Sequence, residues 1–139
     1  MNAIAYASNP KTYRIVGNLL TWIAAVFQLL DGAAKLFKPQ PVVDATLALG
    51  FPENTVAGMG IVLIIGTIAY LIPRTALFGA ILVTAYLGGA VAAHVRVKDP
   101  WFSHVLFPVY LALLLWAGLA LRDNRLRRLL FAPANDGLP

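Results

Sequence analysis

The sequence predicts an all-α integral membrane protein, a four-helix bundle with both termini in the cytoplasm. Hydrophobic residues make up 60% of the 139 residues and charged residues only 12%, and the mean hydropathy is +0.75. This composition is far from that of an ordinary soluble domain. Four apolar runs reach or approach the roughly 17 to 25 residues that a helix needs to cross a bilayer. The expected spans are 15–37, 56–72, 75–95 and 105–121 within one domain, 1–139, and a basic cytoplasmic tail follows at 122–139.

The first run, 15–37, is expected to remain in the membrane as a span. Its apolar part is too long for a cleavable signal peptide, and no small-residue cleavage site precedes a polar domain. The segment VVDATLALG that follows is too short to cross, so we expect it either to lie along the outer interface or to tuck against the bundle. The chain has no cysteine, which excludes disulfides, thiol relays and thiolate metal sites. A redox role would therefore need a bound cofactor.

Proline and hydroxyl residues predict where the later spans begin and end. Pro73 should end the second span, and Thr75 is placed to cap the third. Pro100 breaks the chain again, and Ser103 is placed to cap the fourth span. Because Pro108 would fall inside that span, it predicts a kink or a late helix start.

The distribution of basic residues predicts the orientation. Seven of them lie on the side that holds both termini, and the positive-inside rule places that side in the cytoplasm. The basic run RDNRLRRLL after the last span is typical of a segment that anchors against anionic headgroups, and we do not predict a nucleic-acid partner. The seven are Lys11, Arg14, Arg74, Arg122, Arg125, Arg127 and Arg128, whereas Lys35, Lys38, Arg96 and Lys98 lie on the opposite side.

Polar residues from three spans are expected to meet near the outer surface. Gln28, Asp31 and Lys35 share one face of the first helix by their i, i+3, i+7 spacing. A charged side chain within a membrane span is energetically costly, so Asp31 and Lys35 are candidates for function. The structural alternative is that the cations extend to headgroups and the acid only pairs with its neighbour. The expected cluster is completed by Tyr86, His94, Arg96 and His104.

The residue types in this cluster favour proton transfer or the binding of a small head group. Asp31 and His94 are the candidate catalytic acid and base, and the other five residues are candidate ligand-binding groups for an anion or a quinone-like head group. No metal is predicted, because the two histidines lie on different elements beside cations. Ser103 beside His104 lacks a nucleophile motif.

Small residues at Ala85, Gly89 and Ala93 form a stripe on the third span that allows helix backbones to approach closely. We expect this stripe to pack within one bundle, with oligomerisation as the alternative.

The runs PRTALFGAILVTAYLGGAVAAHVR and DGAAKLFKP resemble the DoxX-like family of small bacterial four-helix membrane proteins, and the resemblance extends from about Thr21 to Arg128. It implies a bundle in the cytoplasmic membrane and an association with quinone-linked oxidoreductase and oxidative-stress systems. It also implies that Asp31, Lys35, His94, Arg96 and His104 occupy polar positions of the family pattern. Related sequences often carry Glu where this chain has Leu63, which argues against chemistry that would use that carboxylate.

Three functions follow. The first is an accessory or membrane-anchor subunit of a redox complex that contacts quinone, which requires a protein partner. The second is a stand-alone membrane enzyme or binding protein for a small lipophilic molecule, with proton transfer by Asp31 and His94. The third, a transporter, is disfavoured because four spans show little sign of inverted repeats unless the chain forms a homo-oligomer.

Overall fold

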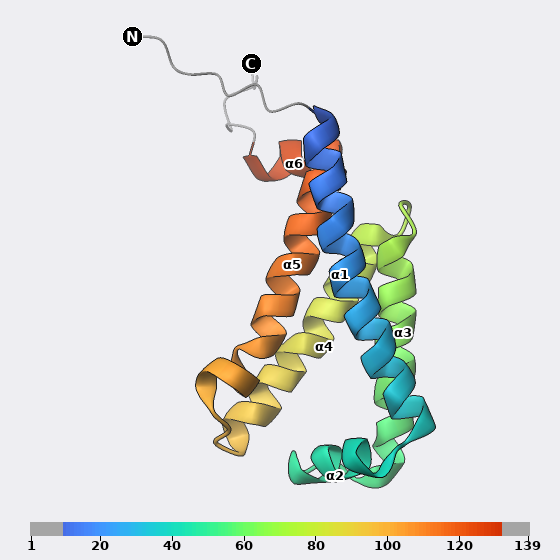
Figure 1. Ribbon diagram of the computed structural model, residues 1–139, viewed down its shortest axis with the longest axis vertical. Coiled ribbons are helices and arrows are strands. Elements are labelled where there is room, and N and C mark those ends of the chain that lie inside the picture. Colours follow the sequence, from blue (N-terminus) through green and yellow to red (C-terminus); the bar gives the residue numbers. More distant parts are fainter. Residues whose placement is uncertain (1–9, 132–139) are drawn as a thin grey trace, which may run out of the picture.

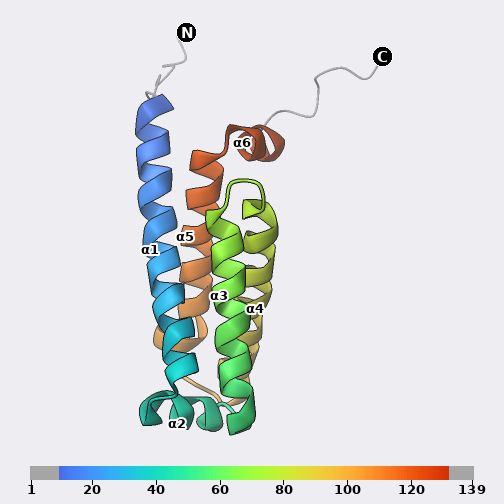
Figure 2. The same cartoon turned by 90° about the vertical axis from the view of Figure 1, so that its right-hand side faces the viewer.

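The computed structural model describes residues 10–131, and all regular structure in this range is helical (Figure 1). Two short helices lie across opposite ends of a bundle of four long ones (Figure 2). We name these ends the α2 end and the α6 end. The long helices are α1 (Pro10–Phe37), α3 (Val56–Leu71), α4 (Ala76–Arg96) and α5 (Phe107–Arg122), and the short ones are α2 (Gln40–Ala48) and α6 (Asn124–Phe131).

Four helical segments are long and apolar enough to cross a membrane, which confirms the predicted all-α class with four spans. A 3-10 turn, η1 (Glu53–Thr55), extends α3 at its start, and a π turn, η2 (Trp101–Val105), precedes α5. Large apolar side chains on the outer surface of the bundle are exposed, as expected for a protein whose solvent is lipid. The spans are Lys11–Phe37, Glu53–Leu71, Ala76–Arg96 and Trp101–Arg122.

Helix α1 packs against α3 and α5, and α4 packs against the same two helices from the other side. The largest fully buried side chain of the core is Tyr70, whose hydroxyl donates to the Leu115 carbonyl at 2.8 Å and lies 3.1 Å from the Thr21 hydroxyl. Helices α3 and α4 lie in close contact at Gly79, where an added Cβ would press into the backbone of Tyr70. The hydroxyl contacts of Tyr70 join α1, α3 and α5, three of the four spans.

The small-residue stripe lies largely outside this packing. Ala85 and Gly89 are exposed, an added Cβ at Gly89 would meet open space, and only Ala93 of the three is buried. The expectation that the stripe packs within one bundle is therefore wrong for Ala85 and Gly89. The close approach instead falls at Gly79, about three turns away on α4.

Several expectations about the turns are confirmed and two are wrong. Helix α2 tucks against the bundle through buried Val43, and α5 starts late, with Pro108 in its first turn. Thr75 occupies the position before α4, but its hydroxyl donates to the Ala69 carbonyl at 2.8 Å and caps nothing. Ser103 lies within η2 and not at a helix start.

Candidate functional site at the α2 end of the bundle

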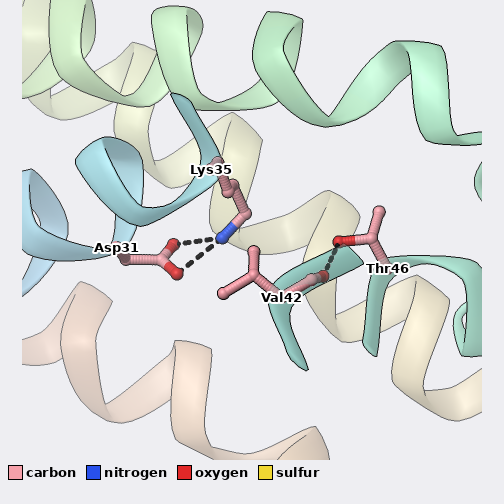
Figure 3. Close-up of polar contacts among 4 residues, drawn as sticks. All are labelled: Asp31, Lys35, Val42 and Thr46. Atoms are coloured by element: carbon pink, nitrogen blue, oxygen red, sulfur yellow. Dashed lines mark hydrogen bonds and ion pairs between the residues drawn. The ribbon is translucent and has the colours of Figure 1, made fainter. Parts of the chain in front are cut away.

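An ion pair on α1 lies near the α2 end. The Lys35 Nζ contacts both Asp31 carboxylate oxygens, at 2.5 and 2.6 Å (Figure 3). The helix repeat places residues i and i+4 on one face, so the pairing follows from their spacing. The Lys35 side chain is 14% exposed and that of Asp31 37%. The two charges therefore neutralise each other at a depth where either alone would be costly.

One turn deeper, Gln28 is 1% exposed and contacts Thr67 of α3, with 3.1 Å between Gln28 Oε1 and the Thr67 hydroxyl. Its Nε2 has no hydrogen-bond partner in the described part of the chain. The Thr67 hydroxyl has one proton and also lies 2.7 Å from the Leu63 carbonyl. Rotating the Gln28 amide by 180° would turn its N–H toward Thr67 and leave Oε1 unpaired instead. In either orientation one amide atom of Gln28 lacks a partner.

Tyr86 of α4 completes this group from across the bundle. Its partly buried ring packs against the core cluster, and the Asp31 carboxylate acts electrostatically on its hydroxyl. We call Gln28, Asp31, Lys35 and Tyr86 the amide group. It consists of three polar residues on one face of α1, one of which has the unpaired amide, and one hydroxyl residue of α4.

The histidines form a second group farther along α4. His94 Nδ1 lies 2.6 Å from the Asp99 carboxylate, and the ring centroids of His94 and His104 are 5.8 Å apart. The Ser103 hydroxyl lies 2.8 Å from His104 Nδ1. The turn from α4 into η2 thus gathers the residues that the sequence placed on two spans. We call His94, Asp99, Ser103 and His104 the histidine group.

The structure pairs Asp31 and His94 with different partners. Asp31 binds Lys35 and His94 binds Asp99, and α1 and α4 diverge toward the α2 end (Figure 1). Eight residues separate Tyr86 from His94, a rise of about 12 Å along the helix. The polar residues expected in one cluster therefore fall into two groups.

Arg96 belongs to neither group. Its guanidinium donates to the Leu49 carbonyl and lies 5.9 Å from the centroid of the Phe51 ring. Gly50 has a φ of 79° and would bring a Cβ into the Arg96 side chain, so glycine is required there. Together with Phe51 and Gly89, Arg96 lines a pocket of ≈ 200 Å³. Its contacts fasten the end of α4 to the chain after α2.

Sequence reasoning did not identify Thr67 as the partner of Gln28, and it treated Leu63 only as a missing carboxylate. Leu63 is 2% exposed and lies in the hydrophobic core. Its carbonyl contacts Thr67, so it positions the Thr67 hydroxyl beside Gln28 through the backbone. A hydroxyl four residues after an apolar position of a span is the available signal, because such side chains commonly bond the carbonyl one turn back.

The fold and its paired intramembrane charges define an integral membrane protein of the four-helix type. The model of the DoxX-like family matches residues 19–118. The chain therefore belongs to the DoxX-like family, as its resemblance implied. Comparisons with curated proteins and with solved structures gave no match.

Proposed function

We propose that the protein binds the uncharged head group of a small lipophilic molecule, with quinone as the candidate, at the amide group. In this proposal it acts as an accessory or membrane-anchor subunit of a quinone-linked redox or oxidative-stress system of the bacterial inner membrane. The observation that carries the proposal is the unpaired, buried amide of Gln28.

An unpaired buried polar atom costs roughly 1–3 kcal/mol, and such atoms are few in folded proteins. A ligand that hydrogen-bonds to Gln28 would recover that energy. As the amide stands, Nε2 would donate to a carbonyl oxygen. In the rotated orientation, Oε1 would accept from a hydroxyl. Reduction converts the carbonyl oxygens of a quinone into hydroxyls. An amide that can present either a donor or an acceptor suits both forms of the head group.

The neighbouring residues fit an uncharged ligand. The charges of Asp31 and Lys35 already satisfy each other, and the Tyr86 hydroxyl offers a further donor from α4. A bound quinone would supply the redox chemistry of its ring. The residues of this chain would hold and orient it. The chain has no cysteine to ligate an iron–sulfur cluster, and in this proposal any further electron carrier belongs to a partner protein.

The alternative is a stand-alone membrane enzyme that uses Asp31 and His94 as acid and base. It has less support, because each of these residues is paired with another residue and the two lie on diverging helices. Asp31 and His94 are catalytic candidates under this alternative alone.

The proposal is tested by native mass spectrometry of the protein extracted from its own membrane in mild detergent, comparing wild type with Gln28→Leu. Thr21→Val is the matched control, since Thr21 is another buried polar residue of α1 but has a partner in Tyr70. We expect the wild type and Thr21→Val to retain a lipophile that Gln28→Leu loses. A wild type without bound lipophile, or equal retention by Gln28→Leu, would contradict the site.

The subunit part of the proposal has its own readout. A second protein at fixed stoichiometry in the same spectra would support it, and its absence after extraction from intact membranes would refute that part alone. Stability separates the site from folding defects. The ligand-free Gln28→Leu protein should be at least as stable as wild type, because the substitution removes an unpaired buried group.

A further inference from the structure

A basic pocket of ≈ 660 Å³ opens at the α6 end, far from the amide and histidine groups. It is lined by the start of α1, the turn from α3 into α4, the end of α5 and helix α6, and the residues of α1 lie more than 100 positions before those of α5 and α6. Its polar lining includes Arg14, Arg122, Arg125 and Arg128. We propose that this pocket binds the phosphate group of an anionic phospholipid.

The positive charge of the pocket is largely uncompensated. Four arginines and one acidic residue, Asp123, line it, which gives a net formal charge of +3. The Asp123 carboxylate accepts from the backbone N–H of Arg125 at 2.8 Å and of Leu126 at 3.3 Å, so it is occupied at the start of α6. Neither ion pair found within residues 10–131 involves an arginine. Guanidinium groups present paired N–H donors that match phosphate oxygens.

One of the four arginines also has a structural role. Arg122 donates to the Tyr70 carbonyl at 2.5 Å and lies 4.7 Å from the centroid of the Tyr70 ring. This contact fixes its guanidinium at the wall of the pocket. Arg14, Arg125 and Arg128 also line the pocket, and all three are exposed.

The position of the pocket fits a lipid rather than a soluble anion. Helix α6 lies across the bundle where the last span ends (Figure 2), at the level where headgroups meet a membrane protein. Leu119, Ala76 and Pro73 give the pocket an apolar side next to the spans. A ligand with a phosphate and an adjoining acyl chain would satisfy both sides, and basic pockets between spans bind such headgroups.

Arg127 supplies an internal control. It lies on α6 between two pocket residues, but its guanidinium lies 5.2 Å from the centroid of the Tyr13 ring and donates to Asn124 Oδ1 at 3.0 Å. It carries the same charge at the same membrane level without lining the pocket. General attraction to an anionic surface would weaken by roughly fivefold for any arginine removed at this level. A pocket would respond only to the arginines that line it.

The experiment titrates the purified protein in detergent with phosphatidylglycerol or phosphatidylcholine and counts bound lipid by native mass spectrometry. We expect one saturable phosphatidylglycerol, favoured over phosphatidylcholine, with roughly tenfold or greater weakening in Arg14→Gln and Arg128→Gln. Arg127→Gln and Arg74→Gln should stay within about fivefold of wild type. Arg122 is left unchanged because it also holds Tyr70.

Competition with inorganic phosphate distinguishes the two sources of the anion. Failure of millimolar phosphate to displace the lipid supports a lipid site. Displacement by phosphate, with the same dependence on Arg14 and Arg128, would overturn the lipid assignment and identify a soluble phosphate ligand. Equal weakening in all four variants, or no preference for phosphatidylglycerol, would overturn the pocket itself. None of these readouts depends on Gln28 or on a bound quinone.

Discussion

Removing Lys35 while Asp31 remains is the perturbation that most directly tests the paired charges in α1. In Lys35→Met the side chain keeps its length and apolar stem but loses the ammonium that contacts both carboxylate oxygens, at 2.5 and 2.6 Å. The Asp31 carboxylate then stays within the span without its cation. We expect this variant to be clearly less stable than wild type.

The magnitude follows from burial. Breaking a buried ion pair by removing one partner costs roughly 3–5 kcal/mol. The Asp31 side chain is 37% exposed, so we take the lower end and expect a loss of about 3 kcal/mol. Asp31→Asn should cost about 2 kcal/mol, because the long Lys35 side chain can move its ammonium toward the interface. The double variant should also lose only about 2 kcal/mol, which gives a coupling of about 3 kcal/mol.

Equilibrium unfolding in mixed micelles, followed by tryptophan fluorescence, measures these values. Lys38→Met is the control, since Lys38 lies one turn beyond Lys35 and outside the ion pair, and we expect a change below about 0.5 kcal/mol. Additive losses in the double variant would refute the reasoning. They would mean that each charge is solvated independently and that the pair contributes little in the membrane.

Two further predictions use the same unfolding measurement. Gly79→Ala should destabilise by about 1–3 kcal/mol because its Cβ would press into the Tyr70 backbone, whereas Gly89→Ala on the same helix should be neutral or stabilising by up to about 1 kcal/mol. Equal effects of the two substitutions would contradict the assigned packing of α4. Tyr70→Phe should cost about 2 kcal/mol, since it removes the hydroxyl contacts to Thr21 and Leu115. An unchanged free energy of unfolding in Tyr70→Phe would contradict this prediction, because it would mean that the Tyr70 hydroxyl contributes nothing to stability.

The spans could be predicted from sequence because their determinants are local. A run of apolar residues, its length and its flanking prolines decide whether a helix crosses, and these properties do not depend on the rest of the fold. Helix ends depend on more. The Thr75 hydroxyl turns back to Ala69 of α3, and Ser103 is taken into a π turn that follows from how η2 folds onto α4. Neither outcome is encoded in the residues next to the cap.

In the candidate site, too, contacts within one helix could be predicted from sequence, whereas contacts between helices could not. The Asp31–Lys35 pair was accessible from sequence because the helix repeat fixes its geometry. His94 was expected near Asp31 because the two residues lie at a similar depth along their spans. Depth does not determine whether two helices converge or diverge at that level. The partner of Gln28 depends on how α1 and α3 are rotated against each other, which hydropathy alone does not determine.

The two ends of the bundle differ in how their charges are satisfied, and this difference predicts that ligand binding depends on salt at one end only. At the α2 end, Asp31 and His94 have their own partners, and the group left unpaired is an uncharged amide. At the α6 end, Arg14 and Arg128 line a pocket with a formal charge of +3. Hydrogen bonding to an amide is little affected by ionic strength, whereas attraction between exposed charges is screened.

Raising the salt concentration from 0.05 to 0.5 M should therefore weaken phosphatidylglycerol binding severalfold while leaving retention of the lipophile unchanged. Native mass spectrometry of one preparation, diluted from the two salt conditions, reports both ligands together. Loss of the lipophile with rising salt would contradict the assignment of an uncharged head group to Gln28. Salt-independent binding of phosphatidylglycerol would mean that its acyl chains, and not the arginines, hold it at the α6 end.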